Sequence, residues 1–122
     1  MVKMKNMDKE DMLVPQEGDV LLCVSITKSM KSGERGSLYE ATRKWWRLSP
    51  KTVQDVTHVL GVYEGEVKVV YDDVVWQLTA DPRYAGRLEF TSAHPDGVKS
   101  DYIGKYYRMR RPTVKLRKEN KL

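Results

Sequence analysis

Two adjacent tryptophans within a cluster of cations are the residues of this chain best suited to bind a ligand. Trp45 and Trp46 follow Arg43 and Lys44 and precede Arg47. An indole offers a flat surface on which a base can stack, and neighbouring cations can hold phosphates, as single-stranded or flipped-out bases require. Neighbouring side chains on a helix point about 100° apart, so both indoles cannot share one buried stripe. We expect Trp46 to be the exposed indole that stacks on a base.

The predicted site extends beyond this pair. The preceding loop, residues 28–36, contains two glycines and further cations, and Trp76 lies in a valine-rich strand pattern where it is either core or a second aromatic wall. The candidate nucleic-acid-binding residues are Arg35, Arg43, Lys44, Trp45, Trp46, Arg47, Trp76, Arg110 and Arg111. The structural alternative is that one indole anchors a helix to a sheet, the other covers the core edge and the cations form a solvated face.

The tryptophan pair is predicted to lie on a helix over residues 37–47. Ser37 and Glu40 have the spacing of a capping box, and Glu40 stands four residues before Lys44, where it supports a helix. Ser49 and Pro50 end this helix and favour a second helical turn over residues 50–55, with Ser49 as its cap.

The rest of the chain has the pattern of short strands. A first strand is predicted over residues 19–27, before the helix, with both faces apolar at its start and one polar face at its end. Glu64 and Gly65 indicate a tight hairpin between two further strands. The later strands are expected over residues 57–63, 66–71, 74–78, 87–93 and 100–108. This order predicts an α+β fold, a small curled, mostly antiparallel sheet or pseudo-barrel with one or two short helices packed over it.

Length and charge favour one intracellular domain with a basic end. The chain has 122 residues and a net charge of +5, and from Arg108 to Leu122 seven Lys and Arg residues stand against one Glu. We therefore expect a flexible lead-in over residues 1–18, one globular domain over 19–107 and a basic tail over 108–122 that attracts a polyanion. No apolar run is long enough for a membrane span or a secretory signal, which favours a cytoplasmic protein.

The order of these elements resembles that of the PUA-like domains, a group that includes the EVE and ASCH types. Four segments, residues 38–43, 46–47, 59–65 and 102–105, also resemble parts of small bacterial and phage proteins with the same layout. The likeness spans about residues 19–107. It implies a pseudo-barrel whose cleft between helix and sheet receives RNA or a modified base in DNA, in the cytoplasm of a bacterium or of a phage-infected host.

Two other function classes stay open at this stage. Exposed Trp and Arg also suit a protein-interaction module, such as a phage-encoded inhibitor of a host restriction or defence enzyme, with a host protein as partner. Glu66 and Lys68 form the E-x-K half of a metal-dependent nuclease, for which Asp55 and Asp72 are poorly placed as the second acid.

The sequence offers little else for catalysis. His58 falls inside an apolar strand and His94 in a turn, so a pair of imidazoles for acid–base chemistry has little support. The lone cysteine, Cys23, fits a buried small hydrophobe. No metal-ligand spacing, glycine-rich phosphate loop or nucleophile elbow is present, so we assign no catalytic residue, cofactor or metal and favour binding without catalysis.

Overall fold

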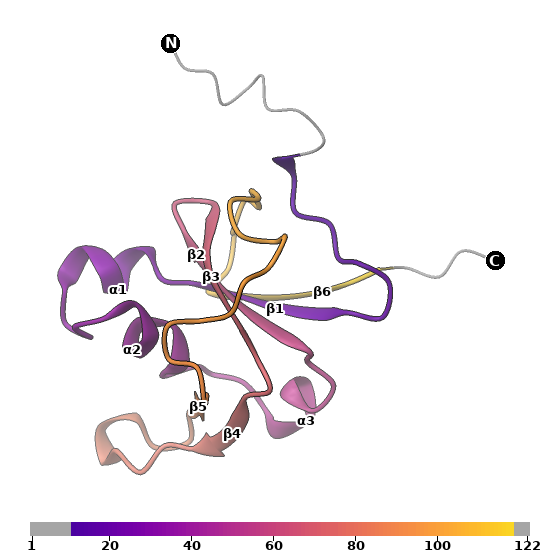
Figure 1. Ribbon diagram of the computed structural model, residues 1–122. Helices are drawn as coiled ribbons and strands as arrows, with labels where there is room; N and C mark the ends of the chain where they lie inside the picture. Colours follow the sequence, from indigo (N-terminus) through magenta and orange to yellow (C-terminus); the bar gives the residue numbers. More distant parts are fainter. Residues whose placement is uncertain (1–10, 119–122) are drawn as a thin grey trace.

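The centre of the fold is a four-stranded sheet that combines one strand from near each end of the chain with two from its middle (Figure 1). The computed structural model describes residues 11–118. The strands are β1 (Val20–Ser25), β2 (His58–Tyr63), β3 (Glu66–Asp72) and β6 (Thr113–Arg117), in the order β3-β2-β1-β6. β1 and β2 are parallel, and the other two pairs are antiparallel.

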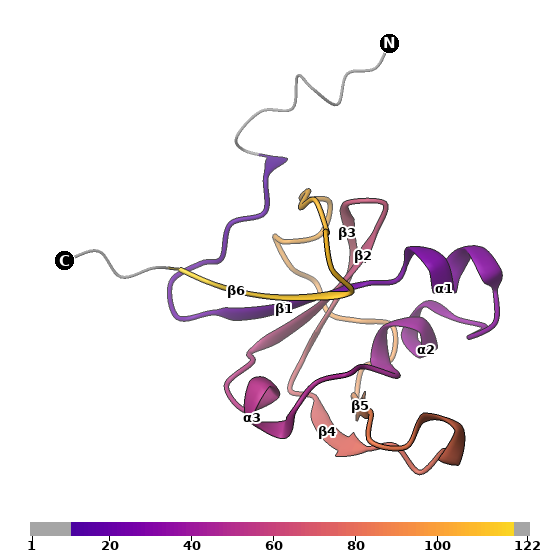
Figure 2. The same ribbon diagram turned by 180° about the vertical axis from the view of Figure 1, so that it is seen from behind.

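A smaller sheet and three short helices complete the fold. The small sheet pairs β4 (Val75–Leu78) with β5 (Leu88–Thr91) in antiparallel fashion, and the 3-10 turn η3 (Pro82–Tyr84) lies in the loop between them. The helices are α1 (Thr27–Ser32), α2 (Leu38–Arg43) and α3 (Pro50–Val53). Seen from both sides, α3 and the small sheet lie at the end of the molecule away from the β2–β3 hairpin (Figures 1 and 2). The predicted small, mostly antiparallel α+β fold is confirmed, and its sheets do not close into a barrel.

Side chains alternate along β1 between two buried faces of the central sheet. Leu22 and Val24 face the cluster that contains Ala41 of α2, whereas Leu21 and Cys23 face a second cluster. This double burial explains why β1 is a continuous apolar run. Cys23 is fully buried, and burial raises the pKa of its thiol to about 12, so its predicted role as a small core residue is confirmed.

The residues predicted to form the hairpin turn and to cap the two helices do so in the structure. Glu64 and Gly65 have φ values of 49° and 87° and join β2 to β3, as a tight hairpin requires. The hydroxyl of Ser37 accepts a hydrogen bond from the Glu40 N–H at 3.1 Å, and that of Ser49 accepts one from the Thr52 N–H at 3.2 Å. These caps fix where the two segments around the tryptophans begin.

Close packing brings α2 against β2 at a glycine. A Cβ atom on Gly61 would stand 2.8 Å from both the Thr42 hydroxyl oxygen and a methyl carbon of Val69. The Thr42 hydroxyl in turn donates to the Leu38 carbonyl at 2.8 Å. A side chain at position 61 would therefore push α2, and the tryptophans that follow it, away from the sheet.

The predicted helix and loop boundaries around the tryptophans are wrong. α2 ends at Arg43, because Lys44 is extended with φ −157° and ψ 159°, so neither tryptophan lies on the helix. Residues 27–32, expected in a strand end and a flexible loop, form α1. α1 ends at Gly33, whose φ of 72° is a common way for a helix to stop, although in the sequence this glycine indicates only a loop.

The predicted domain limits also need correction at both ends. The expected basic tail contains β6, which pairs with β1 inside the main sheet, so the domain does not end at residue 107. Before β1, Leu13 is buried and its N–H donates to the Tyr106 carbonyl at 2.8 Å, so residues 11–18 are packed on the body. The expected strand over 100–108 is a series of turns along the edge of β3. Residues 1–10 and 119–122 of the predicted lead-in and tail lie outside the described part.

Asp55 attaches β6 to the segment after α3, and this contact makes stability depend on pH. Its carboxylate accepts hydrogen bonds from Lys115 Nζ and Arg117 Nη2, each at 2.6 Å, which lower the pKa of Asp55 from 3.8 to about 2. Since the folded-state pKa is depressed, the ionised group stabilises the fold above about pH 4, and this contribution is lost as pH falls toward about 2.

We therefore expect the melting temperature of Asp55→Asn to fall less than that of the wild type between about pH 4 and pH 2, because the variant lacks this titration. Thermal denaturation followed by circular dichroism across this range measures the difference. The matched control is Asp101→Asn, at an exposed aspartate without an ion pair among the described residues. Parallel acid curves for wild type and Asp55→Asn would contradict this role of Asp55.

Within residues 11–118, none of the helices has the length and apolar character needed to cross a membrane.

Candidate nucleic-acid interface

Trp46, the indole expected to stack on a base, is a core residue. Only 7% of it is exposed, and its Nε1–H donates to the Thr42 carbonyl at 2.9 Å. Its backbone N–H donates to the Leu88 carbonyl at 3.0 Å, and its carbonyl accepts from the Leu88 N–H at 2.9 Å. Trp46 thus connects α2 to β5, and the prediction that it is the exposed member of the pair is wrong.

Trp45 is the partly exposed tryptophan, and it stacks on Tyr84 of the β4–β5 loop. The two ring centroids are 4.0 Å apart and the ring planes differ by 10°. The Trp45 Nε1–H donates to the Thr79 hydroxyl at 3.0 Å, which fixes the indole in the plane of the stack. Two rings from segments about forty residues apart therefore form one rigid aromatic unit.

Cations flank both rings of this stack. The Arg35 guanidinium carbon and Lys44 Nζ lie 4.6 and 4.7 Å from the Trp45 ring centroid. Arg35 is held in place because its Nη1 donates to the Lys44 carbonyl at 2.7 Å. Arg83 and Arg87 lie 5.5 and 5.3 Å from the Tyr84 centroid. The stack therefore combines cation–π contacts with a concentration of positive charge.

A hollow of about 530 Å³ lies beside Tyr84, and we call it the basic groove. Its walls come from the segment between α2 and α3 and from the β4–β5 loop around η3. The lining residues are Arg47, Leu48, Ser49, Arg83, Tyr84, Ala85, Gly86 and Arg87. Its volume falls within the range of small-ligand sites, and its charged lining residues are all arginines. The groove is therefore suited to an anion that also carries a flat ring.

Two arginines of the groove are free to bind an anion. Arg47 and Arg87 form no ion pair with any residue among 11–118, and Arg47 is exposed. Arg83 is instead held by Asp81, whose oxygens accept from its Nε at 3.1 Å and from its Nη2 at 2.8 Å. Hydrogen bonds from Arg83 lower the pKa of Asp81, so this pair stays charged at neutral pH. Arg47 and Arg87 are the groove's uncompensated charges.

Arg43 and Lys44, both predicted to hold phosphates, are engaged within the protein. Arg43 Nε donates to the Phe90 carbonyl at 2.7 Å, and its Nη atoms contact Glu40 at 3.1 Å and Glu89 at 3.5 Å. Lys44 pairs with Glu40 at 2.9 Å, as its spacing predicts, although Lys44 itself lies just beyond the end of α2. Burial raises the pKa of Glu40, but hydrogen bonds from Lys44 and Arg43 outweigh it and leave the pKa below its usual value. Arg43 therefore positions α2 against β5.

The remaining predicted residues lie elsewhere. Trp76 packs edge-on against Phe90, with ring centroids 5.1 Å apart, and lines an apolar pocket beside α3. Arg110 and Arg111 are exposed and line a separate hollow of about 350 Å³ with Tyr107. That segment precedes β6, at the end of the molecule away from η3 (Figures 1 and 2). The structure does not bring these three residues to the basic groove.

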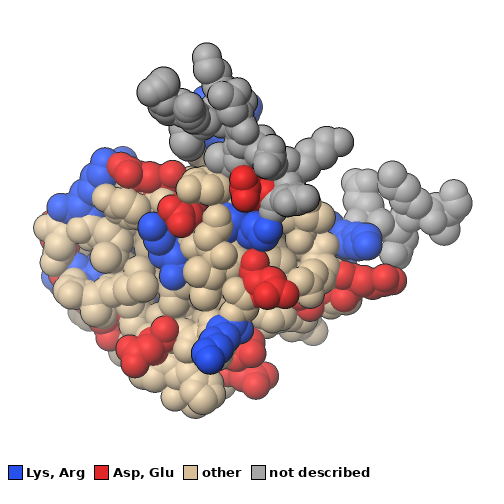
Figure 3. All heavy atoms as spheres, turned by 45° about the horizontal axis from the view of Figure 1, so that its top comes forward, with Lys and Arg blue, Asp and Glu red and all other residues tan. Residues whose placement is uncertain are grey.

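On the face of the molecule drawn in Figure 3, Lys and Arg side chains are mixed with Asp and Glu, without a large area of one sign. The net charge of +5 is therefore not gathered on this face.

Sequence reasoning missed the half of the site that the β4–β5 loop supplies. Arg83, Tyr84 and Arg87 repeat, within five residues, the combination of an aromatic ring and arginines that drew attention to the tryptophans. Their position between two expected strands indicates only a loop. Tyr84 stacks on Trp45 because of tertiary packing, and the spacing of residues along the sequence does not predict this contact.

The arrangement required by a metal-dependent nuclease does not form within residues 11–118. Glu66 and Lys68 pair with each other at 3.1 Å on β3, while the Asp55 carboxylate is occupied by Lys115 and Arg117. In this part of the chain no three His, Cys, Asp or Glu residues gather where they could hold a metal ion. His58 contacts the Thr57 hydroxyl at 2.8 Å, and no contact joins it to His94.

Comparisons of this chain with protein-family models, curated proteins and solved structures find no match. The resemblance to PUA-like domains therefore stays a prediction.

Proposed function

We propose that the protein binds single-stranded nucleic acid, or a base displaced from a duplex, in the basic groove, in the cytoplasm. The observation that carries the proposal is the Trp45–Tyr84 stack beside arginines that have no acidic partner in the described part of the chain. A base stacks on the groove side of Tyr84, and Arg47 and Arg87 contact the flanking phosphates. Stacking is sequence-tolerant, so little preference among bases is expected from these contacts alone.

Two features favour an unpaired base over a regular duplex. A base within a duplex already stacks on its neighbours, so only an unpaired or displaced base can present its face to Tyr84. The groove is also bounded on both sides, by residues 47–49 and by residues 83–87. Binding needs no catalytic group, and the proposal assigns none.

The experiment is a titration of fluorescently labelled oligothymidylate and of a hairpin duplex, followed by anisotropy at several salt concentrations. The two phosphate contacts, from Arg47 and Arg87, give an expected slope of log affinity against log salt of about −1.4 for a single strand, so a fourfold rise in salt weakens binding about sevenfold. The single strand is expected to bind more tightly than the duplex. Affinity that does not change with salt, or preference for the duplex, would contradict the proposal.

A further inference from the structure

β4 presents an open sheet edge on the outside of the molecule. In the small sheet it pairs only with β5, and no described strand lies on its other side. It lies at the lower margin of the molecule in Figure 1. Exposed strand edges are commonly protected by Lys, Pro or a covering element, because they can pair with another chain. The sequence of β4, Val-Trp-Gln-Leu, contains neither Lys nor Pro, and no described strand covers its outer edge.

The backbone groups that face outward can be assigned from the ladder. The N–H and the carbonyl of Leu88 both bond to Trp46, so they point away from β4. The Thr79 N–H, by contrast, donates to the Arg87 carbonyl on the β5 side. Because hydrogen-bonded pairs alternate along an antiparallel ladder, Gln77 and Val75 bond to β5, whereas Trp76 and Leu78 direct their N–H and C=O groups away from it. No backbone bond joins these outward groups to another described residue.

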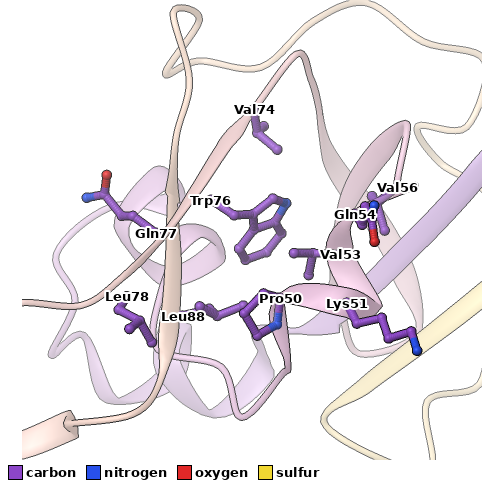
Figure 4. Close-up of a pocket in the computed structure, with 10 residues that line it drawn as sticks. All are labelled: Pro50, Lys51, Val53, Gln54, Val56, Val74, Trp76, Gln77, Leu78 and Leu88. Carbon is purple, nitrogen blue, oxygen red and sulfur yellow. The ribbon is translucent and has the colours of Figure 1, made fainter.

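Apolar side chains and a pocket accompany this edge. Val75 and Leu78 are 62% and 63% exposed. Beside them lies a pocket of about 640 Å³ between β4 and α3, where the Trp76 ring points toward Val53 and Pro50 (Figure 4). Leu78 stands at the rim of this pocket. The edge thus combines free backbone groups with apolar surface that no described residue covers.

We propose that β4 pairs with β4 of a second copy of this chain, giving a continuous sheet in the order β5-β4-β4-β5. A two-fold axis through Gln77 places Trp76 of each copy opposite Leu78 of the other. Trp76 and Leu78 are the residues whose backbone groups point outward, so each Trp76–Leu78 pair across the axis can exchange two backbone hydrogen bonds. Both copies then use the same residues, as a two-fold interface requires. On the pocket side, Leu78 of each copy then covers Trp76 of the other.

The lack of charge along the edge favours a second copy over an unrelated strand. A two-fold axis brings like residues together, so a lysine or glutamate on this strand would meet its own charge. β4 contains none, and Gln77, whose Nε2 donates to Glu89 Oε2 at 3.2 Å, keeps its second N–H and its carbonyl oxygen for Gln77 of the other copy. The basic groove lies outside the pairing residues, so the dimer carries two grooves.

Dimerisation is tested by sedimentation velocity on the full chain from about 10 µM to about 1 mM, the range expected for so small an interface. The wild type is expected to shift from monomer to dimer as concentration rises. Leu78→Pro removes an outward N–H without breaking the β4–β5 ladder, and it should stay monomeric with an unchanged melting temperature. If proline disturbs the fold, Leu78→Lys serves instead, with Ile103→Lys, at an exposed residue outside β4, as the control that still dimerises.

A cysteine substitution tests the register itself. In the proposed pairing, the Cα atoms of the two Gln77 residues are about 4.5 Å apart, within the range for a disulfide. Gln77→Cys should form a covalent dimer under mild oxidation, whereas Thr91→Cys on β5 should not, and native Cys23 is buried. A wild type that is monomeric throughout, a dimer that survives Leu78→Pro, or equal cross-linking of both variants would overturn the proposal. None of these results depends on nucleic-acid binding.

Discussion

Trp46→Ala is expected to lower the free energy of unfolding by about 3–5 kcal/mol, the usual cost of removing a buried tryptophan. The substitution leaves a cavity where α2, β5 and the main sheet meet, and it leaves the Thr42 carbonyl without its indole donor. Urea unfolding measures the change. Because small domains are stable by about 5–15 kcal/mol, the variant should be close to the limit of folding at 37 °C.

Trp45→Ala is the control for this result. Trp45 is partly exposed and stacks on a loop residue, so its loss should destabilise the fold clearly less than the loss of Trp46. It should nevertheless weaken oligonucleotide binding, since Tyr84 loses its support. Equal destabilisation by the two substitutions would show that Trp46 does not have the structural role assigned to it.

The double variant Arg47→Ala/Arg87→Ala is expected to weaken binding of a single-stranded oligonucleotide about 150-fold or more at low salt. Each arginine would lose a charge-assisted contact to a phosphate, worth about 1.5–3 kcal/mol. The salt slope should also become shallower by about 1.4, because two phosphate contacts are gone. The melting temperature should change little, since neither side chain has an ion pair in the described structure.

The matched control is Arg110→Ala/Arg111→Ala. It removes the same charge from exposed residues away from the basic groove. If binding depends on the groove, this control keeps most of the wild-type affinity and differs only by the general effect of lower net charge. Similar losses in the two double variants would mean that attraction is nonspecific and that the groove is not the binding site.

Local signals made much of the fold predictable from sequence. A short apolar run identified β1, and Glu64-Gly65 identified the hairpin, because the chemistry of each of these features lies within a few residues. Ser37 and Ser49 marked two helix starts for the same reason. Each of these predictions agrees with the structure.

Features that depend on distant partners were not predictable in this way. β6 looks like a charged tail, and it becomes a strand because Val114 and Leu116 pair with β1 and because Asp55 binds its cations. Trp45 and Trp46 are chemically alike, so only the end of α2 at Arg43 decides which of them is buried. The basic groove likewise exists only because the β4–β5 loop folds against residues 45–49.

Nitrogen-15 NMR during an oligothymidylate titration shows where on the protein the nucleic acid binds. If it binds at the basic groove, amide shifts concentrate at residues 47–49 and 83–87, together with the indole signal of Trp45, while the indole signals of Trp46 and Trp76 change little. Shifts concentrated at residues 108–112, or no shifts at oligonucleotide concentrations that saturate binding in anisotropy, would contradict binding at the basic groove.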